Sequence, residues 1–445
     1  MRKFAAFIAI CAIFLALLAG CYQEEKPSSL PLLLSGDSTE PDAQANAAGD
    51  HPELTIWSFF DLDKTFLDKF AEAHPDVKIH TKTFAFEDAL KAYIQSFTAG
   101  NSPDLFYLDN SFLGAFSGND LLQDTLTPPF SAGKYRKQIA DAIWESALSI
   151  DGKKLLAMPV GLAPAVTFYR ADILAKYGFP TNPVELGNYI AHEENWLGMG
   201  KELKKHGIYI DQWDTEPMDL FALAHGLFDR NLNYQRDNDV FARALNISRN
   251  INRLGLDSRI NIWNQDGNKA VSEGKFAMVY MGSWGEEQLK AWAPETSGLW
   301  RVTFAPFGQY GNWGSTLLAI SSTSRHKELA WDFIETQFNT KSESLVTIPG
   351  NLQLQHDEND LKRPHPFLGD QPAGVILQQA VDNMPARVAT PLDQEAEAFW
   401  KKTMSEHIFS GLDTKTAIHD VQSQVTAKFA DKIDQIRNYL HGQNR

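Results

Sequence analysis

Residues 54–79 read LTIWSFFDLDKTFLDKFAEAHPDVKI and contain two apolar runs separated by one helical stretch. Residues 54–57 are a short apolar run, and residues 77–84 have the composition of a second strand. Between them, residues 63–73 repeat large apolar side chains at the three- and four-residue spacing of a helix. The stretch therefore predicts a strand, a helix and a strand in direct succession.

The same alternation continues downstream. Residues 87–99 have an amphipathic helical pattern that stops at GNSP, residues 100–103, a combination typical of a helix end. Residues 105–108 are a third apolar strand. Strands separated by single helices predict right-handed crossovers and a parallel sheet, so the predicted fold class is α/β.

The remainder of the chain is richer in helix. Strands are predicted at 208–210, 276–281, 300–304 and 317–320, and helices at 184–205, 218–228, 240–253, 328–338, 375–383 and 417–440.

The first residues have the composition of an export signal. Two basic residues precede an uncharged apolar stretch, residues 4–19, which is shorter than the roughly 20 apolar residues that a membrane span needs. The stretch ends in LAGC at residues 18–21, which resembles the lipobox of bacterial lipoproteins. The resemblance implies a signal peptide over residues 1–20, cleavage before Cys21 and a diacylglycerol on the Cys21 sulfur. An ordinary secretory signal and a retained membrane helix are the alternatives.

The composition that follows the signal excludes several classes of protein. Residues 21–52 are rich in Ser, Pro, Asp, Ala and Gly and predict a flexible tether. Cys11 leaves with the signal, so the mature body would have no disulfide, no Cys-bound zinc and no Cys nucleophile. Removal of Arg2 and Lys3 takes the formal charge from −15 to −17, which argues against a nucleic-acid partner.

Six stretches, each a weak motif by itself, follow one another in a fixed order. They are LTIWSFFDLDKTFLDKFAEAHPDVKI (54–79), AGNSPDLFYLDN (99–110), LLAMPVGLAPAVTFYRADILAKYGFP (155–180), AVSEGKFAMVYMGSW (270–284), NWGSTLLAISSTSRHKELAWDFIETQF (312–338) and PFLGDQP (366–372). Together they resemble the family 1 extracellular solute-binding proteins, the maltose-binding-protein-like group, over most of residues 53–440.

The resemblance implies a two-lobed periplasmic-binding-protein-like fold, with a ligand cleft between lobes that are joined by crossing strands. The chain would cross near residues 160–164 and 312–318, and return near 350–370. The implied domains are an N-terminal lobe built from 53–161 and 315–355, a C-terminal lobe built from 162–314, and C-terminal helices over 356–445 that belong mainly to the C-terminal lobe.

The resemblance also implies a function. The protein would bind a carbohydrate, either a mono- or an oligosaccharide, and deliver it to the membrane permease subunits of an ABC transporter. It would be a monomeric binding protein with no enzymatic activity, no cofactor and no metal, anchored by lipid to the cell membrane in the periplasm or on the outer face. The 11 tryptophans either pack in the core or supply aromatic surface that suits the apolar faces of sugar rings.

Candidate ligand residues of the first lobe can be named by position, because ligands of open α/β sheets sit beyond the carboxyl ends of the strands. They are Ser58, Phe59 and Asp61 after the first strand, Phe86 and Glu87 after the second, and Asp109 and Asn110 after the third. Asp and Asn at such positions can instead cap the next helix, which is the favoured role for Asp61, and Glu87 could equally be a first-turn residue.

The second lobe and the second crossing add further candidates through the resemblance. They are Asp211 and Trp213 after an apolar strand, Trp284 in the Met-Gly-Ser-Trp setting of the family's strand-end tryptophan, and Asn312, Trp313 and Gly314 at the crossing. A buried core position is the alternative role for Trp284, and hinge packing is the alternative for Trp313.

The chain departs from the family pattern at two places. The first crossing reads GLAP at residues 161–164, without the acidic residue that relatives which bind α-glucans often carry, so maltodextrin is not implied. Gly314 is followed by Ser315, where many relatives have a second glycine.

A secreted carbohydrate hydrolase is the main rival function. The sequence has no Gly-x-Ser-x-Gly elbow and no His-Glu-x-x-His motif, and its histidines are not spaced as metal ligands. Asp109 and Asp211 could still face each other across the lobes as a pair of glycosidase carboxylates. A binder of a non-sugar solute and a scaffold or chemoreceptor partner are further alternatives.

Overall fold

The structure is a computed structural model and describes residues 52–341, 344 and 346–442. The predicted signal peptide, the tether up to residue 51 and the proposed lipidation site, Cys21, lie outside these residues. Within the described ranges, no helix combines the length and the apolar composition needed to cross a membrane.

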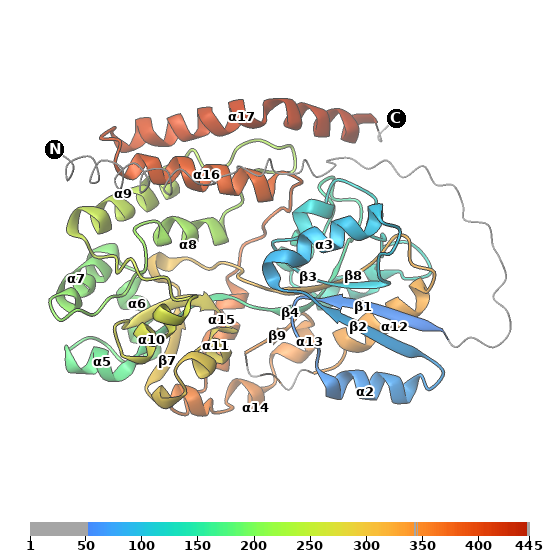
Figure 1. The fold of residues 1–445 in the computed structure, drawn as a ribbon, viewed down its shortest axis with the longest axis horizontal. Coiled ribbons are helices and arrows are strands. Elements are labelled where there is room, and N and C mark those ends of the chain that lie inside the picture. The colour runs from blue at the N-terminus through green and yellow to red at the C-terminus, as the bar shows by residue number, and fades with distance from the viewer. Residues whose placement is uncertain (1–51, 342–343, 345, 443–445) are drawn as a thin grey trace, which may run out of the picture. The chain divides into compact units, whose positions relative to one another are not determined.

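The first sheet has six strands in the order β2-β1-β3-β8-β4-β9 (Figure 1). Its strands are β1 (Glu53–Ser58), β2 (Lys78–Thr83), β3 (Leu105–Asp109), β4 (Met158–Leu162), β8 (Thr316–Ile320) and β9 (Ile348–Pro349). β1 pairs in parallel with both β2 and β3, which confirms the predicted parallel arrangement of the first three strands. The other pairs are antiparallel, so the complete sheet is mixed.

Burial explains the order of these strands. Every residue of β3 is buried, as expected for a strand covered on both faces, whereas β2 is an edge strand with mostly exposed side chains, including two lysines. The associated helices are α2 (Lys64–Ala73), α3 (Phe86–Thr98), α4 (Asp141–Ser146) and α12 (Lys327–Phe338), with 3-10 turns η1 (Leu113–Phe116) and η2 (Ala132–Gln138).

The second sheet has three antiparallel strands in the order β6-β5-β7. The strands are β5 (Ala165–Arg170), β6 (Met278–Gly282) and β7 (Trp300–Phe304). Seven helices belong to this part of the chain, namely α5 (Ala171–Lys176), α6 (Pro183–Ile190), α7 (Glu193–Lys204), α8 (Glu216–Ala224), α9 (Asp239–Leu254), α10 (Gln265–Ser272) and α11 (Gly285–Trp292), with turns η3 (Pro294–Thr296) and η4 (Pro306–Gly308).

Two predictions for this region were wrong. The single helix expected over 184–205 is two helices, because His192 is extended with φ −93° and ψ 122° and starts α7 as its N-cap residue. Glu193 and Glu194 follow in the first turn, where negative charge favours a new helix start. The strand expected over 208–210 is reduced to one parallel bridge between Tyr209 and Phe276.

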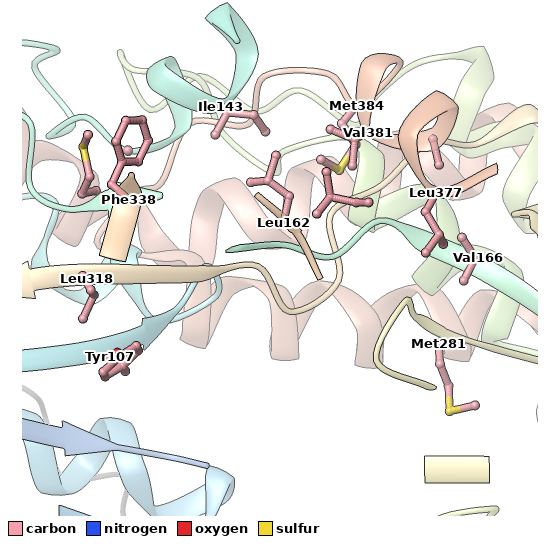
Figure 2. Close-up of a cluster of buried hydrophobic side chains, with 14 of the residues drawn as sticks. Tyr107, Ile143, Leu162, Val166, Met281, Leu318, Phe338, Leu377, Val381 and Met384 are labelled. Atoms are coloured by element: carbon pink, nitrogen blue, oxygen red, sulfur yellow. The ribbon is translucent and has the colours of Figure 1, made fainter. Parts of the chain in front are cut away.

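The two segments that connect the sheets pair with each other. Pro164 and Asn312 form an antiparallel bridge, the Trp313 N–H donates to the Ala163 carbonyl at 2.9 Å, and the Ala165 N–H donates to the Gly311 carbonyl at 2.8 Å. Figure 2 shows Leu162 and Val166 on the first of these segments, within a hydrophobic cluster that reaches from Tyr107 to Met281. The predicted crossing strands are therefore present, and a shared core surrounds them.

The C-terminal part of the chain is helical from residue 352 onward, apart from its connections. It contains α13 (Leu352–Gln355), α14 (Glu358–Leu361), η5 (Pro366–Leu368), α15 (Gly374–Asp382), α16 (Asp393–Ile408) and α17 (Thr414–Gly442). α15 packs against β5, β7 and β9, and α16 contacts η1 and α9 while lying beside α17 (Figure 1). Both α15 and α16 therefore contact elements associated with the first sheet and elements associated with the second sheet.

Candidate functional site

A cavity of about 630 Å³ lies where these parts meet. Its lining comes from the residues after β3, from α4, from the segment 212–223 that covers most of α8, from residues 261–263, from the crossing segment and from residues 384–401. The lining residues are Asn110, Ser111, Ile143, Ser146, Gln212, Trp213, Glu216, Asp219, Leu220, Ala222, Leu223, Asn261, Trp263, Asn312, Trp313, Met384, Pro385, Arg387, Val388, Ala389, Asp393, Gln394, Glu397, Ala398, Trp400 and Lys401. Its volume falls in the range usual for small-molecule sites.

Four tryptophans contribute to the cavity wall: Trp213, Trp263, Trp313 and Trp400. Trp213 and Trp263 are 41% and 49% exposed, which is unusual for so large an apolar side chain. Trp263 contacts a second layer of indoles, with ring centroids 5.9 Å from Trp284 and 5.2 Å from Trp292. Contacts of this kind hold the Trp263 ring in place, whereas Trp400 is only 1% exposed and offers the cavity little ring surface.

The crossing segment is fixed by hydrogen bonds from the end of β3. The side-chain oxygen of Asn110 accepts from the N–H groups of Gly314 at 3.1 Å and Ser315 at 3.0 Å, and the Asn110 N–H donates to the Ser315 carbonyl at 3.0 Å. The Asn312 side-chain oxygen accepts from the Ser315 N–H at 3.2 Å. Asn110 and Asn312 therefore hold Trp313 in place as well as line the cavity.

A buried acidic group supports the wall near α8. Both carboxylate oxygens of Glu216 accept from Gln212, one from its N–H at 2.7 Å and the other from its side-chain amide at 2.6 Å. Asp211 is 1% exposed, and within the part of the chain described here its oxygens have no hydrogen-bond partner. Burial, and next the Glu216 carboxylate, raise the pKa of Asp211 well above its ordinary value.

The part of the cavity wall formed by residues 384–401, the C-terminal wall, carries paired charges. Arg236, which is fully buried, donates to both oxygens of Glu397 at 2.7 and 2.6 Å, and Arg387 donates to the same carboxylate at 2.6 Å. The Arg236 guanidinium lies over the Trp400 ring at 4.2 Å. Lys401 forms an ion pair with Asp219 at 2.7 Å. These contacts fix α16 against the elements of the second sheet.

The same helix is also fixed to the first part of the chain. The Gln394 side-chain amide donates to the Ser111 carbonyl at 3.0 Å, and the Arg387 N–H donates to the Ser146 hydroxyl at 3.1 Å. Gly114 is so close to the start of α16 that an added Cβ would lie 2.5 Å from the Thr390 carbonyl oxygen. α16 and the segment before it therefore bridge the cavity.

Of the residues predicted from the sequence, Asn110, Trp213, Asn312 and Trp313 line the cavity together. Three others support these from behind. Trp284 donates from its indole nitrogen to the Trp313 carbonyl, Gly314 lies beside the Trp284 ring, and Asp211 is buried two residues before Trp213.

The remaining predicted residues lie outside the cavity lining. Asp109 is buried and accepts from the N–H and hydroxyl of Ser111 at 2.8 and 2.6 Å, so it holds the turn after β3; burial raises the pKa of its carboxyl. The carboxyl groups of Asp109 and Asp211 thus do not face the cavity as the glycosidase alternative requires.

The candidates after β1 and β2 form a separate group. Phe59 packs against Phe86, with ring centroids 5.5 Å apart. Ser58 is buried, and its hydroxyl donates to the Phe60 carbonyl and accepts from the Phe60 N–H. Glu87 is exposed in the first turn of α3. Asp61 is exposed and does not cap α2; that role belongs to Asp63, whose carboxylate accepts from two N–H groups.

The contribution of residues 384–401 was not predicted from the sequence. A signal was present, since Asp393, Glu397 and Lys401 are spaced four residues apart and share one helix face next to Trp400. Trp263 was also missed, although it lies in the polar segment NIWNQD, residues 261–266. In the described ranges, no group of three or more His, Cys, Asp and Glu side chains is arranged to hold a metal ion.

Comparison with known proteins gives the family and the fold. Residues 65–346 match the family described as bacterial extracellular solute-binding protein. An uncharacterized lipoprotein of Streptomyces antibioticus is 25% identical over 379 residues, which cover 79% of this chain and 76% of that protein.

Two solved structures illustrate the likeness in fold. The galacto-N-biose/lacto-N-biose I-binding protein of an ABC transporter from Bifidobacterium longum, in complex with lacto-N-biose, has a TM-score of 0.70 and 17% identity, covering 87% of this chain and 99% of that one. The GacH receptor of Streptomyces glaucescens, solved unliganded and with acarbose, has a TM-score of 0.65 and 16% identity, covering 84% and 98%. The predicted two-lobed α/β fold is confirmed.

Proposed function

Since the chain belongs to the bacterial extracellular solute-binding proteins, we propose that it is the substrate-binding subunit of an ABC importer and that its ligand is a carbohydrate. The observation that carries the proposal is the cavity with three partly or largely exposed tryptophans in its wall, Trp213, Trp263 and Trp313. Indole faces stack on the apolar faces of sugar rings, and the surrounding amides and carboxylates can accept from or donate to sugar hydroxyls. The ligands of the two similar structures, lacto-N-biose and acarbose, support the same class.

The division into lobes is part of the proposal. We assign residues 53–161 and 315–355 to the first lobe and 162–314 to the second, with the helices after residue 356 mainly on the second. A sugar that contacts Asn110 in the first lobe and Trp213 in the second would favour the closed arrangement by its differential contacts. The closed form would then dock on the permease subunits.

The family is extracytoplasmic by its description, and its members are binding proteins rather than enzymes. We extend this to a monomer that is held at the membrane by a lipid on Cys21. The lipobox-like residues 18–21 and the similarity to a Streptomyces lipoprotein support the anchor.

A thermal-shift screen of the full chain in detergent, against mono- and oligosaccharides, tests the carbohydrate proposal. A sugar at about a hundred times its dissociation constant adds about 2.7 kcal/mol to the free energy of unfolding. A raised melting temperature with the sugar recovered intact supports the proposal. Recovery of cleaved sugar would favour the hydrolase, and a rise with peptides or polyols alone would favour a non-sugar solute.

A further inference from the structure

The ionisable side chains that line the cavity each already have a hydrogen-bond or ion-pair partner within the protein. They are Glu216, Asp219, Arg387, Asp393, Glu397 and Lys401. A ligand with a charged group needs an opposite charge that is available to it, because burying an unpaired charge costs several kcal/mol. The pairing of these six groups therefore bears directly on the charge of the ligand.

The two cations of the wall already have partners. Lys401 is 2.7 Å from an oxygen of Asp219, and Arg387 is 2.6 Å from an oxygen of Glu397. Behind them Arg236, with no exposed surface, binds both oxygens of the same Glu397. An incoming carboxylate or phosphate would have to compete with these acids for the cations.

The anions of the wall outnumber the cations. Glu216 and Asp393 pair with neutral donors, Glu216 with Gln212 and Asp393 with the N–H and hydroxyl of Thr390 at 3.0 and 2.6 Å. Four carboxylates stand against Arg387, Lys401 and the buried Arg236, which leaves a formal charge of −1. Repulsion of a second negative charge is stronger inside such a cavity than in water.

From this arrangement we infer that the cavity takes an uncharged saccharide and discriminates against acidic ones, such as those that carry a uronate or a phosphate. The inference rests on the proposed carbohydrate function and names the class within it. Neutral hydroxyl groups can donate to the remaining lone pairs of the carboxylates without breaking any ion pair. The carboxylate group of a uronate offers only acceptors, and the cations of the wall are already paired with carboxylates of the protein.

The first test compares a library of neutral oligosaccharides with a library of their uronate counterparts on the full chain at pH 8, by thermal shift and then by calorimetry. β-1,6-galactobiose and α-1,4-galactobiose against digalacturonate are the first probes. We expect the neutral member of a pair to bind at least about tenfold more tightly. This is the affinity lost when the acidic member cannot form one charge-assisted hydrogen bond to a carboxylate of the wall. An acidic saccharide as the tightest ligand would overturn the inference and leave the carbohydrate function standing. Silence in both libraries would overturn the carbohydrate function and the inference together.

A pair of variants gives a second, independent readout. Asp219→Asn removes the partner of Lys401 and frees a cation in the wall, so the affinity ratio of acidic to neutral saccharide should rise about tenfold. The matched control Asp219→Asn with Lys401→Gln frees no charge, and the ratio should return to that of the wild type. An unchanged ratio in Asp219→Asn, with a folded protein by circular dichroism, would mean that wall charges do not set the selectivity.

Discussion

The indole nitrogen of Trp284, at the end of β6, donates a hydrogen bond of 2.8 Å to the carbonyl oxygen of Trp313 in the crossing segment. The two rings meet edge to face, with centroids 6.4 Å apart. Gly282 and Gly314 lie against this contact, and a Cβ on either one would collide with the Trp284 ring. The Trp284 indole, just after β6, thus sets the position of a cavity tryptophan, and Gly282 and Gly314 leave room for the contact.

Gly314→Ala should destabilise the protein and weaken saccharide binding. Gly314 has a φ of +95°, and an added Cβ would lie 2.7 Å from the Trp284 indole nitrogen. We expect the free energy of unfolding in urea to fall by roughly 1–3 kcal/mol. Gly100→Ala is the control, because Gly100 also has a positive φ, +68°, but has nothing within 4 Å. Equal losses of binding in both variants would contradict the role given to the Trp284 contact.

Trp213→Ala should lower the affinity for the cavity ligand by at least about tenfold without unfolding the protein. Its side chain is 41% exposed and lines the cavity, so truncation removes stacking surface but little core packing. Calorimetry with the best saccharide of the screen measures the effect. Phe409→Ala, which removes a 68% exposed ring outside the cavity lining, should leave the affinity unchanged. Retained affinity in Trp213→Ala would exclude this ring from the binding site.

Arg230→Ala should shift the protein toward an open arrangement. The Arg230 guanidinium donates to the carbonyls of Glu145, Ser149 and Ile150 and to the Glu145 carboxylate at 2.9 Å, which links the two proposed lobes. Loss of such charge-assisted bonds is expected to weaken saccharide binding about tenfold and to increase the radius of gyration in solution scattering. Arg253→Ala, on the exposed end of α9, makes the same charge change without touching the first lobe and serves as the control.

Asp211→Asn should stabilise the protein at pH 8 and not at pH 4. The folded-state pKa of Asp211 is raised above its unfolded value, so the proton bound in the folded state contributes stability at low pH that is lost as the pH rises through the folded pKa. Replacement by a neutral amide removes that loss. The melting temperature of Asp211→Asn should therefore equal that of the wild type at pH 4 and exceed it at pH 6 and pH 8. Asp61→Asn, at an exposed carboxylate, is the control, and a constant difference at all pH values in Asp211→Asn would contradict the titration.

Cys21→Ser should release the protein from the membrane. If Cys21 carries the diacylglycerol, the wild type will enter the detergent phase of Triton X-114, and intact mass will show the lipid on the new N-terminus. The variant should lack the lipid and remain in the aqueous phase. Detergent partition of Cys21→Ser equal to that of wild type would contradict lipid anchoring at this residue.

Local patterns were sufficient to predict the elements in which neighbouring residues decide the structure. β1, α2, β2, α3 and β3 follow from apolar spacing and from the stop signal near Gly100, because each element is short and continuous in sequence. The break at His192 carries no Pro or Gly, so the pattern ran on through it. Asp63 rather than Asp61 caps α2, a difference of two residues that spacing alone does not resolve.

The cavity was predictable only where it follows the strand-end rule or the family resemblance. Asn110 followed from the strand-end rule, whereas Trp213, Asn312 and Trp313 followed from the family resemblance, and the structure brings the four together. The C-terminal wall was not predicted, because its position is set by contacts between residues remote in sequence. One of these is the hydrogen bond from Gln394 to Ser111 across 283 positions. The four-residue spacing of Asp393, Glu397 and Lys401 indicates a polar helix face but not which part of the chain that face meets.

That separation has a consequence for the biogenesis of the protein. An exported chain leaves the translocation channel from its N-terminus, so Ser111 reaches the outside long before Gln394 does. Until residues 384–401 have followed, the cavity lacks the wall that holds Glu397, Trp400 and Lys401. A nascent or prematurely terminated chain would therefore carry both sheets and yet be unable to capture its ligand, and the acquisition of binding would mark the completion of secretion.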